Sequence, residues 1–440
     1  MIVMKFGGSS VESAAAIERL KSIVQSRLPE RPIVVVSAMG KTTNRLLEAA
    51  GLAVAGKRSE ALDKIEALRA YHHAEADGYG AAAVIDEHFQ ELTELVRGLA
   101  ILGELTPRSI DAISSFGERI SSRVVALALG ATHIDSRAVI VTDERHTQAA
   151  PLYPETNERL AAVAWGELSV MGGFIASTLA GVSSTLGRGG SDFTASIVGA
   201  GVDASEIQIW TDVDGMLTCD PTVLPGGRRV KAISFAEAAE LAYFGAKVLH
   251  PSTVVPAIEK NIPVLILNSR RPDVAGTRIT AEGPKSKDVA KSIACKKNIT
   301  LVNIQSTRML MAHGFLRRIF EIFDRYETSV DMVATSEVSV SLTIDNAARL
   351  ETIRRELEEF AEVETEHDKA IVCLVGDNLR WQPGVAHRMF RALDPVNVRM
   401  ISQGASLRNI SLVVAQSELR EAVERLHREF FTEVDAEVFE

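Results

Sequence analysis

The chain has 440 residues, 46% of them hydrophobic and 24% charged, and this length predicts about three compact units. Its 58 acidic and 48 basic residues give a net charge of −10, which disfavours a nucleic-acid partner, and no segment approaches the ~20 apolar residues of a membrane span. Three cysteines without CxxC spacing predict neither a disulfide framework nor a zinc site, and with no secretory signal before the first strand we expect a cytoplasmic protein.

The first elements along the chain form a βαβ unit. Residues 2–6 are typical of a strand, a glycine turn and an apolar-faced helix follow, and the continuous β-branched run 33–36 indicates a strand buried on both faces. Further apolar strands at 207–210 and 264–267 alternate with helical patterns. This order predicts an α/β fold with a mainly parallel sheet and helices on both faces.

The rest of this first domain is mainly helical. Residues 44–130 are rich in Ala, Leu and Glu, which predicts a helical lobe added to the sheet, and the capping box Ser234-x-x-Glu237 marks the start of another helix. The segment 281–291 is polar and lacks apolar periodicity, so it is predicted to be a linker. We therefore expect the first domain to span 1–280.

The chain after this linker contains an internal repeat. Residues 314–316 align with 384–386, and 340–342 align with 410–412, each at an offset of 70 positions. Each copy has the pattern strand, helix, strand, strand, helix, which predicts an antiparallel sheet with helices on one face. Paired copies beside a catalytic domain favour ligand sensing or dimer formation, although two purely structural modules are the alternative.

The two copies are expected at 292–368 and 369–440, but their boundary need not follow the order of the chain. The short apolar run 292–295 precedes the first strand of the proximal copy at 299–304. It is a candidate strand that the first copy lends to the second, which would interleave the two modules.

A glycine-rich turn at 186–192 is the strongest local indication of a ligand. Its three glycines allow backbone N–H groups to approach an anion closely, and Ser191 can cap the helix that follows. Arg188 adds a planar fork suited to a carboxylate or a phosphate. An ordinary turn is the alternative.

Two strand ends carry further polar groups. Lys5 ends the first strand just before glycines, where its ammonium would suit a polyphosphate, although a solvated lysine is the alternative. Thr211 and Asp212 follow another strand and could hold a nucleotide or its Mg²⁺. No Walker loop and no GxGxxG motif after a strand is present.

Three more residues have both a functional and a structural interpretation. Glu118 lies beside a glycine in a helical run and could bind an ammonium or act as a helix acid. Lys247 lies near a helix end, where it could contact a phosphate or the last carbonyl groups. Thr43 offers a hydroxyl to a ligand or to a helix start.

Five segments in one order, 5–11, 115–118, 185–192, 210–215 and 244–251, together closely resemble aspartate kinases. The resemblance covers essentially the whole chain. It implies an amino-acid-kinase fold followed by two ferredoxin-like ACT regulatory modules. It also implies transfer of the γ-phosphoryl group of ATP, with Mg²⁺, to the β-carboxylate of L-aspartate, giving 4-phospho-L-aspartate and ADP.

The resemblance carries roles over to individual positions. Arg188 would hold the α-carboxylate of the substrate and Glu118 its ammonium, and Leu217 stands where many relatives have a tyrosine in the nucleotide loop. The nucleotide set is Lys5, Gly7, Gly8, Ser9, Thr211, Asp212, Leu217 and Lys247, of which Lys5, Asp212 and Lys247 would be catalytic. The substrate set is Thr43, Glu118, Phe174, Arg188, Ser191 and Asp192.

The repeat region also resembles the lysine-inhibited, single-function branch of the family. Asp331 and Glu337 would bind an ammonium of the effector lysine, with threonine left open as another effector. A homodimer through the ACT modules is implied, with a tetramer as the alternative. The implied allosteric residues are Met309, Leu316, Ser329, Val330, Asp331, Ser336 and Glu337.

Two rival functions remain at this stage. The first is another kinase of the same superfamily, acting on glutamate, acetylglutamate or a nucleotide, and the paired repeats and the segment 115–118 argue against it. The second is a catalytically inactive amino-acid sensor. The presence of Lys5, Arg188, Asp212 and Lys247 favours an active enzyme.

Overall fold

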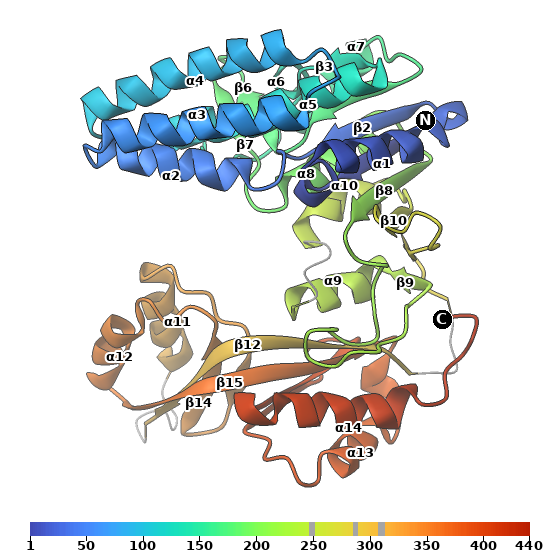
Figure 1. Cartoon of the computed structure of the whole chain (residues 1–440). Helices are drawn as coiled ribbons and strands as arrows, with labels where there is room; N and C mark the ends of the chain where they lie inside the picture. Colours follow the sequence, from blue (N-terminus) through green and yellow to red (C-terminus); the bar gives the residue numbers. More distant parts are fainter. Residues whose placement is uncertain (246–250, 285–288, 307–312) are drawn as a thin grey trace. The chain divides into compact units, whose positions relative to one another are not determined.

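A computed structural model describes residues 1–245, 251–284, 289–306 and 313–440. The chain divides into two compact units (Figure 1). The first consists of Met1–Met216 and Val248–Gly283, and the second of Leu217–Lys247 and Pro284–Glu440. In the described part of the chain, no helix is both long and apolar enough to cross a membrane.

The first unit is built on a mainly parallel sheet. Its strand order is β3-β5-β2-β1-β8-β10-β11, and only the last of these pairs is antiparallel. Every residue of β2 is buried, as its continuous β-branched run predicts for a strand covered on both faces. The bounds are β1 Ile2–Phe6, β2 Pro32–Val36, β3 Thr132–Ile134, β5 Ser169–Gly172, β8 Glu206–Thr211, β10 Val264–Asn268 and β11 Thr277–Thr280.

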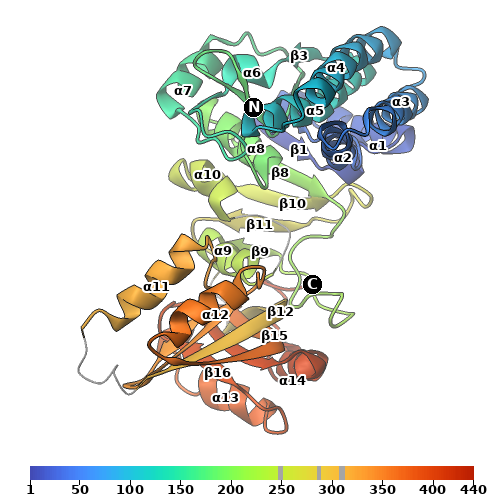
Figure 2. The ribbon, with the colours of Figure 1, turned by 90° about the vertical axis from the view of Figure 1, so that its left-hand side faces the viewer.

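The predicted helical lobe is confirmed as a group of long helices, which Figure 2 shows beside the sheet. Local sequence fixes their ends: the Thr106 hydroxyl caps α5 ahead of a proline, and Gly103 and Gly130 end α4 and α5 in the left-handed region. The helices of the first unit are α1 Ala14–Gln25, α2 Thr42–Val54, α3 Arg58–Glu75, α4 Ala82–Leu102, α5 Pro107–Leu129, α6 Ser136–Val139, α7 Tyr153–Ala162, α8 Gly190–Gly201 and α10 Val255–Glu259.

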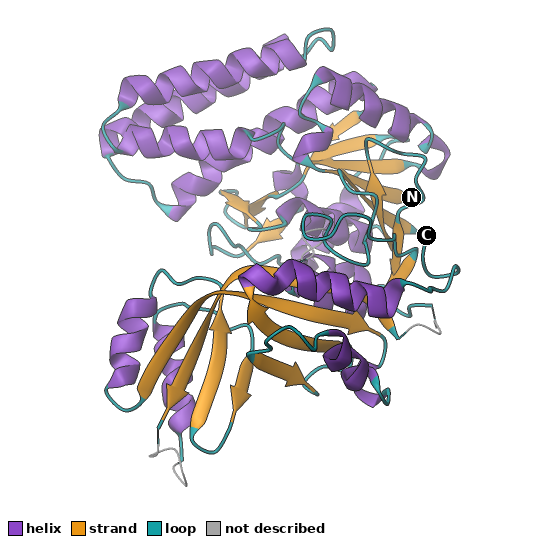
Figure 3. Ribbon diagram, turned by 60° about the horizontal axis from the view of Figure 1, so that its bottom comes forward, coloured by secondary structure: helices purple, strands orange, loops and turns teal. Residues whose placement is uncertain are grey.

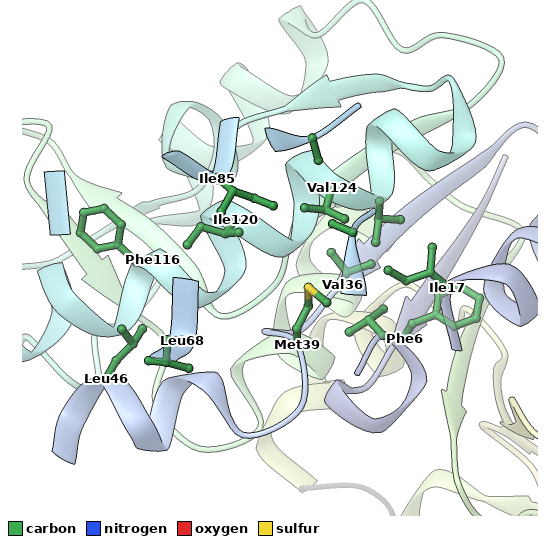
Figure 4. Packing of buried hydrophobic residues seen from close by; sticks show 14 of the residues in the cluster. Phe6, Ile17, Val36, Met39, Leu46, Leu68, Ile85, Phe116, Ile120 and Val124 are labelled. Atoms are coloured by element: carbon green, nitrogen blue, oxygen red, sulfur yellow. The ribbon is translucent and has the colours of Figure 1, made fainter. Parts of the chain in front are cut away.

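One hydrophobic core joins the sheet to this lobe. Phe6 and Val36 from β1 and β2 belong to the same buried cluster as Ile120 and Val124 of α5, and Figure 4 labels all four. The same cluster continues through the helices of the lobe. Helix α5 contributes side chains to the core of both the sheet and the lobe. This shared packing holds α5 against the sheet. A small additional sheet contains β4 Val141–Thr142, β6 Ile175–Thr178 and β7 Ser183–Thr185.

The second unit contains an antiparallel sheet of six strands in the order β13-β14-β12-β15-β17-β16. Figure 3 shows this sheet with its helices. Its strands are β12 Ala290–Gln305, β13 Val333–Thr335, β14 Ser339–Ile344, β15 Glu362–Gly376, β16 Met400–Gln403 and β17 Asn409–Ala415, with β9 Ala232–Ser234 apart from them. Its helices are α9 Phe235–Tyr243, α11 Phe315–Arg325, α12 Leu350–Glu358, α13 Val385–Ala392 and α14 Leu419–Phe431. The predicted capping box of Ser234 and Glu237 starts α9 with both hydrogen bonds formed.

The sequence repeat corresponds to a repeat of structure. Gly314 and Gly384, separated by the offset of 70, both precede a helix with a positive φ, at 81° and 82°. The run Ser292–Cys295 pairs with residues 375–372 of the distal copy, whereas 300–305 pairs with 344–339 of the proximal copy. This pairing is what a strand lent to the distal copy requires.

The predicted linker 281–291 ends inside a strand. Ala290 and Lys291 already belong to β12 and both are buried, although the segment around them is polar. Ala290 pairs with Gly376 and Lys291 lies at the register shift that follows, and this cross-strand pairing, which the linker composition does not indicate, accounts for the difference. The division of the chain into the domains 1–280, 292–368 and 369–440 stays a prediction.

Candidate active site

A pocket of about 280 Å³ lies at the carboxyl ends of the central strands of the first unit. Open parallel sheets bind ligands at this edge. Six of its lining residues were predicted for the site, namely Lys5, Thr43, Glu118, Phe174, Ser191 and Asp192. Its lining residues are Lys5, Ser37, Thr43, Glu118, Phe174, Gly187, Gly189, Gly190, Ser191 and Asp192.

Lys5 reaches the pocket from β1 and forms an ion pair there. Its Nζ lies 2.7 Å from Oδ1 of Asp192, and both side chains are mostly buried. Asp192 lies in the first turn of α8, where the helix dipole favours an acidic group. The Lys5 ammonium is thus neutralised by Asp192, and an anion that binds Lys5 competes with this carboxylate.

Glu118 is a buried carboxylate with incomplete hydrogen bonding. It lies on α5 and is 4% exposed, and its Oε1 accepts a hydrogen bond from the backbone N–H of Ala38 at 3.1 Å. Its Oε2 is buried and has no hydrogen-bond partner in the described structure. Burial raises the pKa of this carboxyl to about 8. A cation placed at Oε2 would lower that pKa, so the group is suited to an ammonium ligand.

The glycine-rich turn is held close to its neighbours by the absence of side chains. Gly187 and Gly189 have φ of 74° and 70°, in the region that favours glycine. A Cβ at Gly190 would lie 2.6 Å from the ring of Phe174, and a Cβ at Gly173 would lie 2.6 Å from Ser191. These glycines let the start of α8 and the Phe174 segment close one side of the pocket.

Asp111 holds this side of the pocket and was not predicted from the sequence. It is fully buried on α5, and its Oδ1 accepts a hydrogen bond from the Thr185 hydroxyl at 2.6 Å. Its carboxylate also accepts the backbone N–H of Thr147 at 3.0 Å and contacts Nδ1 of His146 at 2.7 Å. The loop at 146–148 packs against Gly187, because a Cβ added at this glycine would lie 3.2 Å from the backbone oxygen of Thr147. Asp111 thus links α5, this loop and the strand that leads into the turn.

The predicted nucleotide residues of the first unit lie along the same sheet edge. Phe6 pairs with Trp210, and the N–H of Gly7 donates to the Trp210 oxygen at 3.2 Å, so the turn that includes Gly8 and Ser9 begins beside the end of β8. Thr211 ends β8, and its hydroxyl donates to Oδ1 of the exposed Asp212 at 3.3 Å.

Asp212 is an exposed acidic group at this edge that a metal ion could contact. No group of three or more His, Cys, Asp or Glu side chains that could hold a metal occurs among the described residues. Mg²⁺ that arrives with a nucleotide keeps several waters and needs only one or two protein carboxylates. Asp212 fits such an ion.

Besides the strand-end residues just described, three more predicted residues are absent from the pocket lining that the structure describes. Arg188 is exposed in the turn and forms no ion pair with any described residue. Leu217 belongs to the second unit, where its carbonyl oxygen accepts a hydrogen bond from the Ser292 hydroxyl at 2.7 Å. Lys247 lies outside the described residues.

The predicted allosteric residues lie in the second unit, apart from Met309, which is outside the described residues. Asp331 is buried, Ser336 contacts the hydroxyl of Ser339 at 2.7 Å, and Leu316, Ser329 and Glu337 are exposed, with Val330 partly buried. An unpredicted residue, Lys296, lies with its Nζ 2.7 Å from Asp331.

Comparisons with known proteins identify the family of the chain. Residues 1–268 match the amino acid kinase family and residues 372–430 match the ACT domain. The chain is 42% identical to aspartokinase 3, chloroplastic, of Arabidopsis thaliana, over 98% of this chain and 81% of that protein. It is 36% identical to lysine-sensitive aspartokinase 3 of Escherichia coli strain K12, over 98% of this chain and 99% of that protein.

Solved structures give the same result. Crystal structures of E. coli aspartokinase III with aspartate and ADP and with lysine and aspartate have TM-scores of 0.84 and 0.83 to this chain, at 35% identity. Each comparison covers 98% of this chain, with 100% and 99% of the respective neighbour. The chain therefore belongs to the amino acid kinase family and, within it, to the aspartokinases.

Proposed function

We propose that this chain transfers the γ-phosphoryl group of ATP to the side-chain carboxylate of L-aspartate, forming 4-phospho-L-aspartate and ADP. The main support is Glu118, whose unpaired buried oxygen lies in a pocket with a lysine and a glycine-rich turn. Without a cation beside it this buried carboxyl keeps its proton at neutral pH, because burial raises its pKa to about 8, and the ammonium of an amino acid would stabilise the ionised form. The crystal structure of E. coli aspartokinase III with aspartate and ADP adds support from a close structural neighbour.

The reaction needs positioning and charge neutralisation more than acid–base catalysis. The side-chain carboxylate of aspartate is ionised near neutral pH, so it is already a nucleophile. Its oxygen bonds to the γ-phosphorus while the bond to the bridging oxygen breaks, and ADP leaves with that electron pair. The protein then has to hold the two anions together, which is costly without cations around them.

The residues proposed for this task come from different strand ends. Lys5 would neutralise phosphate oxygens, in exchange for its ion pair with Asp192. Arg188, exposed in the turn, would take the α-carboxylate, and Glu118 would take the ammonium. Mg²⁺, when bound with ATP, would neutralise phosphate charge, and Asp212, exposed after β8, is a carboxylate that would contact it.

The test is the release of ADP with aspartate or glutamate as the acceptor, in the presence of ATP and Mg²⁺. Aspartate should support turnover and glutamate should not, because one additional methylene moves the reacting carboxylate away from the γ-phosphate. Equal turnover with both acceptors would favour a different member of the superfamily. No turnover with either, together with lysine binding, would favour the inactive sensor.

Regulation by lysine and a homodimer through the ACT modules belong to the same proposal. The chain is similar to lysine-sensitive aspartokinase 3 of E. coli, and aspartokinase III of E. coli has been crystallised with lysine and aspartate. Adding lysine or threonine to the ADP assay identifies the effector, and sedimentation of the full chain gives the number of subunits. We propose a cytoplasmic location as well, although the Arabidopsis relative is named as chloroplastic.

A further inference from the structure

The second unit contains an ion-pair cluster formed by one residue of β12 and by residues just outside β13 and β14. Nζ of Lys296, on β12, lies 2.7 Å from Oδ1 of Asp331 and 2.8 Å from Oδ2 of Asp345. Asp331 precedes β13 and its side chain is only 5% exposed, whereas Asp345 follows β14 and is 43% exposed. The lysine side chain is 22% exposed. One ammonium is thus shared between a buried carboxylate and a solvated one.

Asp331 is also the carboxylate proposed above to receive an ammonium of the effector. Lys296 presents the same chemical group, a primary ammonium, and already occupies one oxygen of that carboxylate. We infer that Lys296 is an internal competitor for the effector at Asp331, and that Asp345 keeps the Lys296 ammonium when the effector displaces it. This inference rests on the proposed regulation by lysine and identifies the residue that sets its sensitivity.

The two carboxylates make the exchange feasible. Burial raises the pKa of Asp331, and the Lys296 ammonium acts in the opposite direction, so an ionised Asp331 depends on a cation beside it. Removing that cation without replacement would leave a buried unpaired charge, which is strongly unfavourable. An arriving ammonium fills the position as Lys296 leaves, and the displaced lysine retains a partner that is already hydrated.

The cluster contacts the helix that leads toward Lys247. Tyr243 is the last residue of α9, and its ring centroid lies 5.8 Å from Nζ of Lys296. Gly245, with φ of 119°, packs so closely that a Cβ there would lie 2.1 Å from the Cys295 oxygen. The segment just before Lys247 therefore lies directly on the strand that carries Lys296. A movement of the Lys296 side chain would therefore change its contact with Tyr243 at the end of α9.

The test compares two substitutions in the cluster with one matched control. Lys296→Gln removes the internal competitor, and Asp345→Asn removes the site to which Lys296 retreats. Lys297→Gln makes the same charge change at the neighbouring exposed position, where no described residue forms an ion pair with the lysine. The assay is inhibition of ADP release by added lysine, with lysine binding to the full chain measured by calorimetry.

The two cluster variants should shift sensitivity in opposite directions. If Lys296 occupies Asp331 nine-tenths of the time, Lys296→Gln should lower the lysine concentration for half-inhibition on the order of tenfold. Asp345→Asn should raise it, because Lys296 then has no alternative to Asp331. Lys297→Gln should match the unaltered protein. A purely structural role for the cluster would weaken binding in both cluster variants alike.

Failure of this inference can be told apart from failure of the proposed regulation. Inhibition that is unchanged or weaker in Lys296→Gln, with the parent protein still inhibited, would overturn the inference alone. If added lysine inhibits Lys296→Gln but not the parent protein, the result supports the inference, because Lys296 then blocks the effector completely. If calorimetry detects no lysine binding to any of the proteins, both the inference and the proposed lysine regulation are wrong.

Discussion

Replacing Glu118 by glutamine tests the proposed amino-acid site directly, because it removes the charge and keeps the shape. The pKa of the carboxyl rises from an ordinary 4.5 to about 8 through burial. Between these values the folded protein holds a proton that the unfolded chain has lost. Stability is therefore highest below pH 4.5 as far as this group is concerned, and falls as the pH rises toward 8.

The size of the effect follows from the shift. One pH unit within this window costs about 1.4 kcal/mol, so ionisation costs on the order of 5 kcal/mol of folding free energy at pH 9 as an upper limit. Glu118→Gln does not titrate. The free energy of unfolding, measured with denaturant and without aspartate, should be the same for the variant and the parent protein near pH 4.5. At pH 9 it should be higher for the variant by several kcal/mol.

The substrate should reverse this penalty. An ammonium beside Oε2 favours the ionised carboxylate, so aspartate binding at pH 7 should release a proton, measurable by calorimetry in buffers of different ionisation enthalpy. In Glu118→Gln the release should vanish and the KM for aspartate should rise tenfold to a hundredfold, since a hydrogen bond to a charged group contributes ~1.5–3 kcal/mol. Identical pH profiles of stability in the two proteins, or an unchanged KM, would refute the reasoning.

Three further substitutions test neighbouring parts of the site. Lys5→Ala should abolish ADP release while circular dichroism and cooperative unfolding are retained, and near-normal turnover would remove Lys5 from the mechanism. Asp111→Asn should raise the KM for aspartate and lower stability by about 1–3 kcal/mol through weakened buried hydrogen bonds, so unchanged values of both would exclude its positioning role. Gly190→Ala should weaken aspartate binding because the added carbon meets Phe174, whereas Gly98→Ala, with nothing within 4 Å, should leave kinetics unchanged and stabilise α4 by about 0.5–1 kcal/mol.

Local sequence patterns predicted much of the fold. The continuous β-branched run 33–36 became a strand buried on both faces, and Ser234 and Glu237 formed the capping box expected of them. Gly314 and Gly384, which the repeat aligns at its offset of 70, have nearly the same positive φ, and each precedes a helix. Each of these features depends on residues within a few positions, so chain order alone specifies it.

Strand length was harder to predict. The runs 292–295 and 299–304 look like separate strands because Lys297 and Asn298 between them are polar. In the structure they are one strand, Ala290–Gln305, with a register shift between Lys296 and Ile299 and a positive φ of 59° at Asn298. The irregularity lets one strand contribute to both halves of the sheet, which only cross-strand pairing can determine.

The sequence by itself determined the residue types of the site and their order, including Lys5, Glu118 and the glycine-rich turn. Only the tertiary structure decided which charges meet. Asp111 reaches Thr185 across 74 positions and Lys296 reaches Asp331 across 35, and neither pair has a sequence signature. Ion pairing and burial depend on distance in space, which the packing of helices and sheets sets, whereas sequence patterns report only neighbours along the chain.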